Sequence, residues 1–522
     1  MLSNKTAPQH MGLSAAFTTP HGQNPPNRAD CGQDTTGIRT MQQLLIGGTE
    51  QGRIALNGAM ANRHGLIAGA TGTGKTVTLQ VLAEGFSRLG VPVFTADVKG
   101  DLSGIAVAGK SNDKIQERVQ RIGITDWAAE ACPARLWDLY GRTGQAVRTT
   151  VADMGPALLS NLLELNEVQS GVLHIAFDYA ESEDLPLLDL KDMESLLNWM
   201  VEQRKPLSER YGTLSSQSLG AILRRLLVLK NQGGDVFFGE PALDIMDLIQ
   251  QQNGQGVVNL LDGRELILRP RLYTTFLLWL LAELFERLPE RGDQPLPLLV
   301  FFFDEAHLLF DSAPKALLEK LEQTVRLIRS KGVGIYFVTQ SPSDIPDSVL
   351  GQLGNRVQHA LRAYTPKDQK AVKVAAQTFR ANPDLDTARV ITELGVGEAL
   401  VSVLDDQGIP TPVERTLVAP PRSRIGPADE EALAQLKAAS PLAAKYDQTE
   451  DRDSAHERLQ ARRQRQKEAE QAKPEPEKKA SMKRTSRRQS AGEAFTKSLL
   501  RTLATQLGRV LVRVLERFLK RR

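Results

Sequence analysis

Residues 65–76 read Gly65-Leu-Ile-Ala-Gly69-Ala-Thr-Gly-Thr-Gly-Lys75-Thr76 and decide the fold class. The last eight fit the pattern G-x-x-x-x-G-K-[ST], in which a glycine-rich turn joins a strand to a helix. Four apolar residues precede the turn, and Val77–Phe86 has helical periodicity. The glycines let backbone N–H groups turn inward around phosphate oxygens, and the helix dipole adds to the attraction. We therefore predict a nucleotide-phosphate site formed by Gly69, Ala70, Thr71, Gly72, Thr73, Gly74, Lys75 and Thr76. Within it, we expect Lys75 to reach the β- and γ-phosphates and Thr76 to ligate Mg²⁺.

A second apolar run, Leu298–Phe303, ends in two acids, Asp304 and Glu305. This order places both carboxylates at the carboxyl end of a buried strand, the edge where open α/β sheets bind ligands. We expect Asp304 to join Thr76 in holding Mg²⁺, and Glu305 to orient or deprotonate the water that attacks the γ-phosphate. The alternative is a helix start, because acids at that position stabilise a helix in any protein.

Polar residues also follow two further apolar runs. Gln340 comes after Gly334–Thr339, where its amide is placed to sense the γ-phosphate or the attacking water; an ordinary strand-to-turn transition is the alternative. Asp97 and Lys99 come after Pro92–Ala96. We expect Asp97 to contact the nucleotide, while a subunit contact through either residue, or a simple strand-end turn, is the alternative.

From about Leu44 the chain alternates short apolar runs with longer periodic ones, which is typical of a mainly parallel sheet covered by helices. We predict an α/β core over residues 41–110 and 255–420, interrupted by a mainly helical insertion over 111–254. The expected strands are Gly65–Ala68, Pro92–Ala96, Gly256–Leu261, Leu298–Phe303, Gly334–Val338, Val357–Ala363 and Ala399–Leu404. The expected helices of the long stretch before Leu298 include Met193–Gln203, Leu219–Lys230 and Leu272–Leu288.

Composition excludes several classes of protein. The 522 residues are 41% hydrophobic and 24% charged, and the two cysteines, Cys31 and Cys132, are too few for a disulfide scaffold or a thiolate metal site. The formal net charge is +3, but residues 483–522 carry twelve Lys/Arg against two acids, which leaves the rest at −7. Attraction to polyanions is therefore a property of the tail.

The two ends of the chain differ from its body. Residues 1–40 are rich in Asn, Gln, Pro and Gly, and we expect a disordered extension there. A short helical segment is expected over 421–446. Residues 447–492 hold too few large apolar side chains to offset the entropy of ordering, so we expect a charged disordered linker. Residues 493–522 place leucines and valines at helical spacing among arginines and predict a basic amphipathic helix. Without a signal peptide or an 18-residue apolar span, we expect a cytoplasmic protein, peripheral at the inner membrane if this helix binds lipid.

The combination of Asp97-Val-Lys-Gly-Asp101 with the glycine-rich loop, Asp304-Glu305 and Thr339-Gln340 resembles the HerA/FtsK superfamily of RecA-like ATPases. Within it the sequence looks most similar to the bacterial YjgR-like branch. Asn62–Ile67, Asp304–Phe310 and Leu353–Arg362 carry that likeness, which covers roughly residues 42–420. The resemblance implies a RecA-like core, with ATP as the nucleotide and Mg²⁺ as its cofactor.

The resemblance also implies a ring of subunits, usually a hexamer, in which a neighbour's arginine reaches the γ-phosphate. Arg329 and Arg326 match the family's position on the helix before the glutamine strand; we favour Arg329, and Arg356 is a third candidate. We expect the likeness to be incomplete. The glycine-rich loop begins at Gly69, so we expect no N-terminal β-barrel like that of the archaeal DNA translocases, and we expect a linker where the FtsK branch has a winged helix.

These observations leave three functions to compare. One is a ring-forming motor on DNA or another nucleic acid, with the basic tail adding salt-sensitive attraction. Another is an ATPase that drives a protein or membrane-associated assembly, with the terminal helix on anionic lipid or on a partner protein. The third is a nucleotide-binding switch with little turnover, which Glu305 disfavours. For the terminal helix, docking or self-association, nucleic acid and lipid all stay open.

Overall fold

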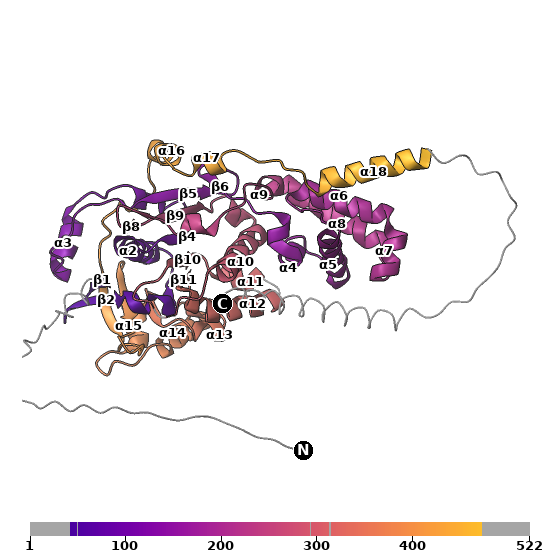
Figure 1. The fold of residues 1–522 in the computed structure, drawn as a ribbon. Coiled ribbons are helices and arrows are strands. Elements are labelled where there is room, and N and C mark those ends of the chain that lie inside the picture. Colours follow the sequence, from indigo (N-terminus) through magenta and orange to yellow (C-terminus); the bar gives the residue numbers. More distant parts are fainter. Residues whose placement is uncertain (1–41, 50, 293, 313–314, 472–522) are drawn as a thin grey trace, which may run out of the picture. The chain divides into compact units, whose positions relative to one another are not determined.

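The computed structural model describes residues 42–49, 51–292, 294–312 and 315–471. Their main feature is a 12-stranded sheet with the order β2-β1-β14-β13-β12-β3-β11-β10-β4-β9-β5-β6 (Figure 1). Its strands are β1 (Gln43–Gly48), β2 (Arg53–Asn57), β3 (Gly65–Ala68), β4 (Val93–Asp97), β5 (Ala134–Asp138), β6 (Gln145–Ala146), β9 (Val258–Asp262), β10 (Leu299–Phe303), β11 (Val333–Thr339), β12 (Asn355–Gln358), β13 (Glu398–Ser402) and β14 (Glu414–Val418). A separate ribbon joins β7 (Gln251–Gln252) to β8 (Gln255–Gly256).

The sheet is parallel from β12 to β6 and antiparallel from β12 to β2. In the parallel part, β3 and β10 both flank β11, with Ala68 paired to Thr339 and Phe303 paired to Phe337. The carboxyl ends of β3, β11, β10 and β4 therefore lie at one edge of the sheet. The predicted α/β fold with a mainly parallel sheet is confirmed.

Alternating side chains of the central strands pack against different helices, as the two-residue period of a strand requires. Val300 and Phe302 belong to the core that contains Phe86 of helix α2, whereas Phe301 and Phe303 belong to the core on the other face, with helices α10 and α12. All four side chains are fully buried. A strand buried on both faces reads as a continuous apolar run, which is why the sequence identified β10.

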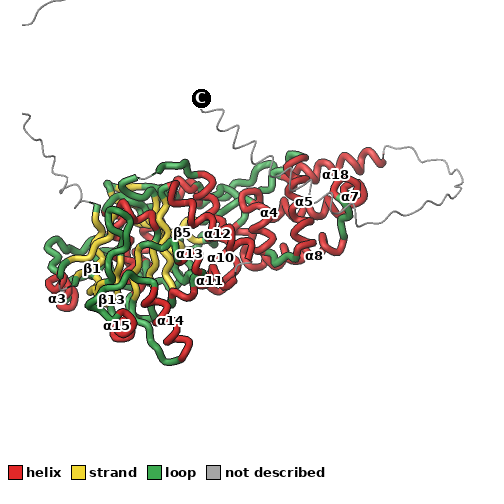
Figure 2. The backbone as a smooth tube through the Cα atoms, turned by 90° about the horizontal axis from the view of Figure 1, so that it is seen from below, coloured by secondary structure: helices red, strands yellow, loops and turns green. Residues whose placement is uncertain are grey.

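The described helices are α2 (Lys75–Arg88), α3 (Asp113–Ile122), α4 (Val151–Leu162), α5 (Glu167–Ser182), α6 (Leu190–Glu202), α7 (Arg204–Tyr211), α8 (Ser216–Leu229), α9 (Asp235–Phe237), α10 (Pro270–Arg287), α11 (His307–Ser312), α12 (Lys315–Leu327), α13 (Asp347–Leu350), α14 (Pro366–Gln377), α15 (Thr387–Glu393), α16 (Glu430–Ala438), α17 (Ala443–Tyr446) and α18 (Ala455–Gln471). Helices α4 to α8 pack on one another without strands between them (Figure 2). Within the described residues, no helix is both long and apolar enough to span a bilayer.

The range 111–254, expected to be mainly helical, also contains β5 and β6, which extend the main sheet beyond β9. The purely helical part therefore begins only at α4. Strand β12 is also shorter than expected: it ends at Gln358 rather than at 363. The apolar residues Ala360 and Leu361 belong instead to a small core with α14 and α15. The division into domains stays a prediction.

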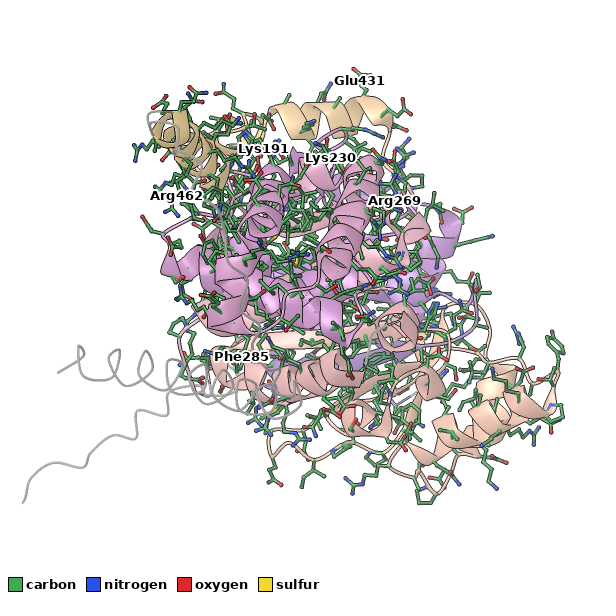
Figure 3. All side chains as sticks on the ribbon, turned by 90° about the vertical axis from the view of Figure 1, so that its right-hand side faces the viewer. Lys191, Lys230, Arg269, Phe285, Glu431 and Arg462 are labelled. Atoms are coloured by element: carbon green, nitrogen blue, oxygen red, sulfur yellow. The ribbon has the colours of Figure 1, made fainter. Side chains whose placement is uncertain are left out.

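The expectation of a disordered linker over 447–492 is wrong for residues 455–471, which form α18. Ala455 and Leu459 are fully buried, and ion pairs fix the exposed side of the helix. Arg462 of α18, labelled in Figure 3, places its Nη1 3.0 Å from Glu183 Oε2. Lys191 at the start of α6, also labelled, places its Nζ 3.3 Å from Glu457 Oε1 of α18. The two buried side chains and the ion pairs together order a helix in a segment whose composition predicts disorder. The predictions for 1–40, 472–492 and 493–522 lie outside the described residues.

A candidate nucleotide-binding site

The glycine-rich loop joins β3 to α2 at the carboxyl edge of the sheet. Gly69, Gly72 and Gly74 have φ values of 153°, 79° and 116°, which residues with a Cβ rarely adopt. The residue before the helix is Gly74, which has no side chain that could cap the first N–H groups of α2. The first N–H groups of α2 are therefore available to an anion in the loop, and the helix dipole favours negative charge there.

Neighbouring strands hold the loop in this shape. Gly69 N donates to Thr339 O of β11 at 3.3 Å, and Ala70 N donates to Ala360 O at 2.8 Å. On the other side of the turn, Thr73 O accepts a hydrogen bond from the backbone N–H of residue 397 at 3.1 Å. The loop is thus fixed by backbone from β11, from the end of β12 and from the approach to β13.

His359 lies against Gly69 of the glycine-rich loop and connects α2 to β13. Its Nε2 lies 2.8 Å from Thr78 Oγ1 in the first turn of α2, and its Nδ1 lies 2.9 Å from Glu398 O. A Cβ on Gly69 would lie 2.5 Å from the Cβ of His359, so only glycine fits there. Burial lowers the pKa of His359 to about 4, and the ring is therefore neutral at pH 7. His359 lies within the stretch Leu353–Arg362 but is not among the site residues predicted from the sequence.

Lys75, the first residue of α2, lies inside the loop. Its Nζ donates to Gly69 O at 2.6 Å and to Ala70 O at 3.1 Å. Burial, with the nearby charge of Lys99, lowers the pKa of Lys75, while Glu305 and Asp304 oppose that shift. Thr71 and Gly72 are exposed, Thr73 is buried, and Thr76 is half-buried. The ammonium of Lys75 therefore faces the space enclosed by the loop backbone.

Asp304 and Glu305 follow β10 in a tight turn. Asp304 Oδ1 accepts the Glu305 N–H at 2.9 Å, and Tyr273 of α10 donates to Asp304 O at 3.0 Å. Both acids are 9% exposed. Burial and the adjacent Glu305 raise the pKa of Asp304 to about 7. Glu305 has a φ of 49°, the left-handed region that strains a residue with a side chain and that recurs at functional sites.

Glu305 is in contact with Lys99, which follows β4. Lys99 Nζ lies 2.8 Å from Glu305 Oε1, and His307 Nδ1 lies 3.4 Å from Glu305 Oε2. Although burial acts to raise the pKa of Glu305, the hydrogen bond and charge of Lys99 outweigh it and lower that pKa. Lys75, Lys99, Asp304 and Glu305 thus form a cluster of two cations and two acids.

Asp97 has a different environment from the one expected. Its carboxylate accepts hydrogen bonds from the backbone N–H groups of Gly100, Asp101 and Leu102, at 2.7, 3.1 and 3.0 Å. Burial and the charge of Asp101 raise the pKa of Asp97 to about 6. Asp97 therefore caps the loop that carries Lys99, which matches the strand-end turn, and a nucleotide contact stays a prediction.

The remaining predicted residues lie at opposite edges of the sheet. Gln340 is exposed at the carboxyl end of β11, between the ends of β3 and β10. Arg326 is exposed near the end of α12, and Arg329 follows in the 3₁₀ turn Ile328–Lys331. This turn lies at the amino end of β3, because His64 Nε2 contacts Val325 O at 2.8 Å. Neither arginine is therefore beside its own chain's glycine-rich loop.

The third arginine candidate, Arg356, is committed to the fold. Its guanidinium donates to Leu353 O, Thr378 O and Leu350 O at 2.9, 2.6 and 2.9 Å. Burial lowers the pKa of this half-buried group. With its donors bonded to carbonyl oxygens, Arg356 ties β12 to α13 and α14.

The residues present fit a magnesium ion that is shared with phosphates. Mg²⁺ prefers oxygen ligands and usually takes only one or two from protein, the rest coming from water and phosphate. The described residues contain no cluster of three His, Cys, Asp or Glu side chains that would hold a metal by themselves. The Thr76 hydroxyl and the Asp304 carboxylate are oxygen donors of the required kind. A cation beside Asp304 would also compensate the adjacent buried charges of Asp304 and Glu305.

Comparisons with known proteins agree with this geometry. A family model described as helicase HerA-like C-terminal matches residues 42–522. The probable helicase MJ1565 of Methanocaldococcus jannaschii is 31% identical over 104 residues, which cover 20% of this chain and 19% of that protein. The chain thus aligns with about a fifth of this curated relative.

Solved structures of the plasmid coupling protein TrwB have a similar fold. In complex with ADP and Mg²⁺, TrwB matches with a TM-score of 0.51 and 15% identity, over 76% of this chain and 94% of that one. In complex with the non-hydrolysable ATP analogue ADPNP, the TM-score is 0.50 at 15% identity, over 75% and 94%. At this identity the likeness concerns the fold alone.

Proposed function

Because the chain belongs to the helicase HerA-like C-terminal family, we propose that it is a Mg²⁺-dependent ATPase that works as a ring of subunits. The observation that carries the proposal is the cluster at the carboxyl edge of the sheet. There Lys75 lies within the glycine-rich loop that follows β3. The buried acids Asp304 and Glu305 follow β10, and β11 is the one strand between β3 and β10 in the sheet. Hydrolysis of ATP requires at least a loop that binds the phosphates and a carboxylate that can act on the attacking water.

Each part has a role in this mechanism. The loop amides and Lys75 bind the β- and γ-phosphates. Thr76 and Asp304 would hold Mg²⁺, which would neutralise charge on the phosphates. Glu305 orients a water molecule and accepts its proton. The water oxygen bonds to the γ-phosphorus, the bond from that phosphorus to the β–γ bridging oxygen breaks, and ADP and phosphate leave. Gln340, at the end of the strand between loop and acids, senses the γ-phosphate or this water.

The arginine that completes the site comes from a neighbouring subunit. Arg329 and Arg326 lie near the amino end of β3, and four residues of strand, roughly 13 Å, separate that end from the glycine-rich loop. A charge from one of them reaches a γ-phosphate only across a subunit boundary. We favour Arg329 and a hexameric ring, in which assembly itself switches hydrolysis on. An arginine supplied in this way accelerates phosphoryl transfer by about 10³- to 10⁵-fold.

DNA is the first substrate to test for the work that hydrolysis drives. The relative from Methanocaldococcus jannaschii is named a probable helicase, and the TrwB structures are those of a plasmid coupling protein. The sequence also supplies a positive tail, with twelve Lys/Arg among residues 483–522. The second candidate is a protein or membrane-associated assembly, favoured by the net charge of −7 on residues 1–482.

The test is steady-state ATP hydrolysis by the full chain, with DNA, RNA or anionic liposomes added, and with oligomer mass measured by light scattering. Glu305→Gln removes the proposed base, and Glu286→Gln makes the same chemical change at an exposed position of α10. We expect DNA to stimulate turnover in a hexamer, Glu305→Gln to abolish it and Glu286→Gln to leave it unchanged. Turnover indifferent to nucleic acid but raised by liposomes would replace the motor with the second candidate. Turnover that survives Glu305→Gln would refute the proposed site.

A further inference from the structure

The loop that carries Lys99 is rigid at its backbone. The Asp97 carboxylate accepts three successive N–H groups of that loop, and Gly100 has a φ of 77°. Arg264 lies against Gly100, where an added Cβ would be 2.9 Å from Arg264 Cδ. Arg264 is held in turn by Asp262 at 2.6 Å. The main chain at Lys99 is therefore fixed, and any movement there belongs to the side chain.

The side chain of Lys99 is free to change partners. It is 42% exposed, whereas the Glu305 side chain with which it pairs is 11% exposed. A lysine carries its charge on a flexible four-carbon stem, so the ammonium can move while the main chain stays in place. The pair is close, at 2.8 Å, and a second anion that accepts the ammonium would offset the loss of its contact with Glu305.

The pair also opposes the role that Glu305 has in hydrolysis. An ammonium on Oε1 occupies a lone pair that would otherwise accept a hydrogen bond from the attacking water. Lys99 lies close enough to Lys75 for their charges to repel. Lys75 is the residue expected at the β- and γ-phosphates, so Lys99 lies within electrostatic range of the place where a triphosphate would bring its terminal negative charge.

We infer that Lys99 is a positioning residue that exchanges its ion pair with Glu305 for the γ-phosphate of bound ATP, and so releases Glu305 to orient the attacking water. The inference rests on the proposed ATPase function and adds the control of that site by its substrate. ADP, which has no γ-phosphate, leaves the Lys99–Glu305 pair intact. The exchange couples recognition of the triphosphate to the freeing of the base.

Equilibrium binding of ADP and of the analogue ADPNP to the full chain, measured by titration calorimetry, tests the exchange without hydrolysis. Lys99→Met removes the charge at similar length, Lys99→Arg keeps it, and Lys114→Met removes an exposed lysine of α3 as a control. We expect Lys99→Met to weaken ADPNP about tenfold, the worth of one charge-assisted hydrogen bond, and to change ADP affinity by less than about twofold. Lys99→Arg restores most of the preference, and Lys114→Met matches the wild type.

A double-mutant cycle with Glu305→Gln separates this exchange from a structural role. In Glu305→Gln, Lys99 loses the carboxylate with which it forms its ion pair, so ADPNP binds more tightly than to the wild type. Adding Lys99→Met removes that gain. Equal losses for ADP and ADPNP in Lys99→Met, or a gain in Glu305→Gln that persists without Lys99, would overturn the inference. Those outcomes leave the ATPase proposal standing, whereas a wild-type chain that binds neither nucleotide overturns both.

Discussion

Replacing His359 by alanine tests whether the strand beside the glycine-rich loop maintains the shape of the nucleotide site. In the structure the imidazole joins Thr78 Oγ1 at 2.8 Å to Glu398 O at 2.9 Å, and it is fully buried. His359→Ala removes both hydrogen bonds and leaves the Thr78 hydroxyl and the Glu398 carbonyl without this partner. It also opens a cavity directly beneath Gly69.

The size of the effect follows from these losses. A buried hydrogen bond contributes about 1 kcal/mol net, and leaving its partner unsatisfied costs about 1–3 kcal/mol. Two such losses and a small cavity destabilise the loop and the start of α2 by about 3 kcal/mol. If about 1.4 kcal/mol of the free energy of ADP binding is used to order the loop in His359→Ala, this variant binds ADP about tenfold more weakly than the wild type does.

The assay is ADP affinity by calorimetry, together with the thermal unfolding midpoint. The matched control is His174→Ala, the same substitution at a half-buried position of α5 outside the site. We expect the control to keep wild-type ADP affinity. Thr78→Val removes the hydroxyl that bonds to His359. The double variant Thr78→Val/His359→Ala should lose about 1 kcal/mol less of the free energy of unfolding than the sum of the two single variants, because both remove the same hydrogen bond. A folded His359→Ala protein with wild-type ADP affinity would refute the reasoning.

Three further predictions follow from other parts of the structure. Burial lowers the pKa of both His64 and His359 from 6.5 to about 4, so below pH 6.5 the unfolded chain binds protons that these two histidines do not bind in the folded chain. Their stabilising contribution should be fully present above pH 6.5 and fall by about 3 kcal/mol for each histidine as the pH drops towards 4, while Asp97 and Asp304, whose pKa values are raised, contribute in the opposite direction. The melting midpoint of the wild type should therefore fall more between pH 7 and 4.5 than that of His359→Gln, and equal changes in the two chains would contradict this. Leu459→Ala should release α18 and make residues 447–471 sensitive to limited proteolysis. Wild-type chain in 1 M NaCl should stay resistant, because the buried leucine contributes more to holding α18 in place than the exposed ion pairs do. Proteolysis of this segment in salt alone would show that the ion pairs contribute more. Chelation of Mg²⁺ should abolish ATP turnover without lowering the melting midpoint of the chain, since the described residues hold no metal cluster of their own; a drop in that midpoint would reveal a structural metal.

The part of the site that lies within single motifs could be predicted from the sequence. Gly69–Thr76 carries its own turn chemistry, and the fully buried run before Asp304 marks a central strand of a parallel sheet. The strands β1, β2 and β14, in the antiparallel part of the sheet, carry no such signal. The pairing of β1 with β14 joins segments that are far apart in sequence. Strand β12 was predicted too long for a related reason, since tertiary contacts turn the chain at His359 towards the loop and take the next apolar residues into another core.

The contacts that surround the motifs could not be read from the chain. The pairing of Lys99 with Glu305 depends on β4 lying next to β10, although 206 positions separate the two residues. The role of His359 likewise depends on β12 lying next to β3. In α18, complementary charge on the helical insertion and two buried side chains order a segment whose composition indicates disorder. The available signals were a lysine that follows a strand end and a histidine within a predicted strand, and each has a common structural explanation.

The most direct measurement of the central claim, that Glu305 activates the water in an ATP site formed by the glycine-rich loop, identifies the nucleotide that stays bound. Wild-type, Glu305→Gln and Glu286→Gln chains are incubated with ATP and Mg²⁺, separated rapidly from free nucleotide and analysed by chromatography. We predict mainly ADP on the wild type and on Glu286→Gln, and intact ATP on Glu305→Gln. ADP on Glu305→Gln in the same proportion as on the wild type would contradict the claim.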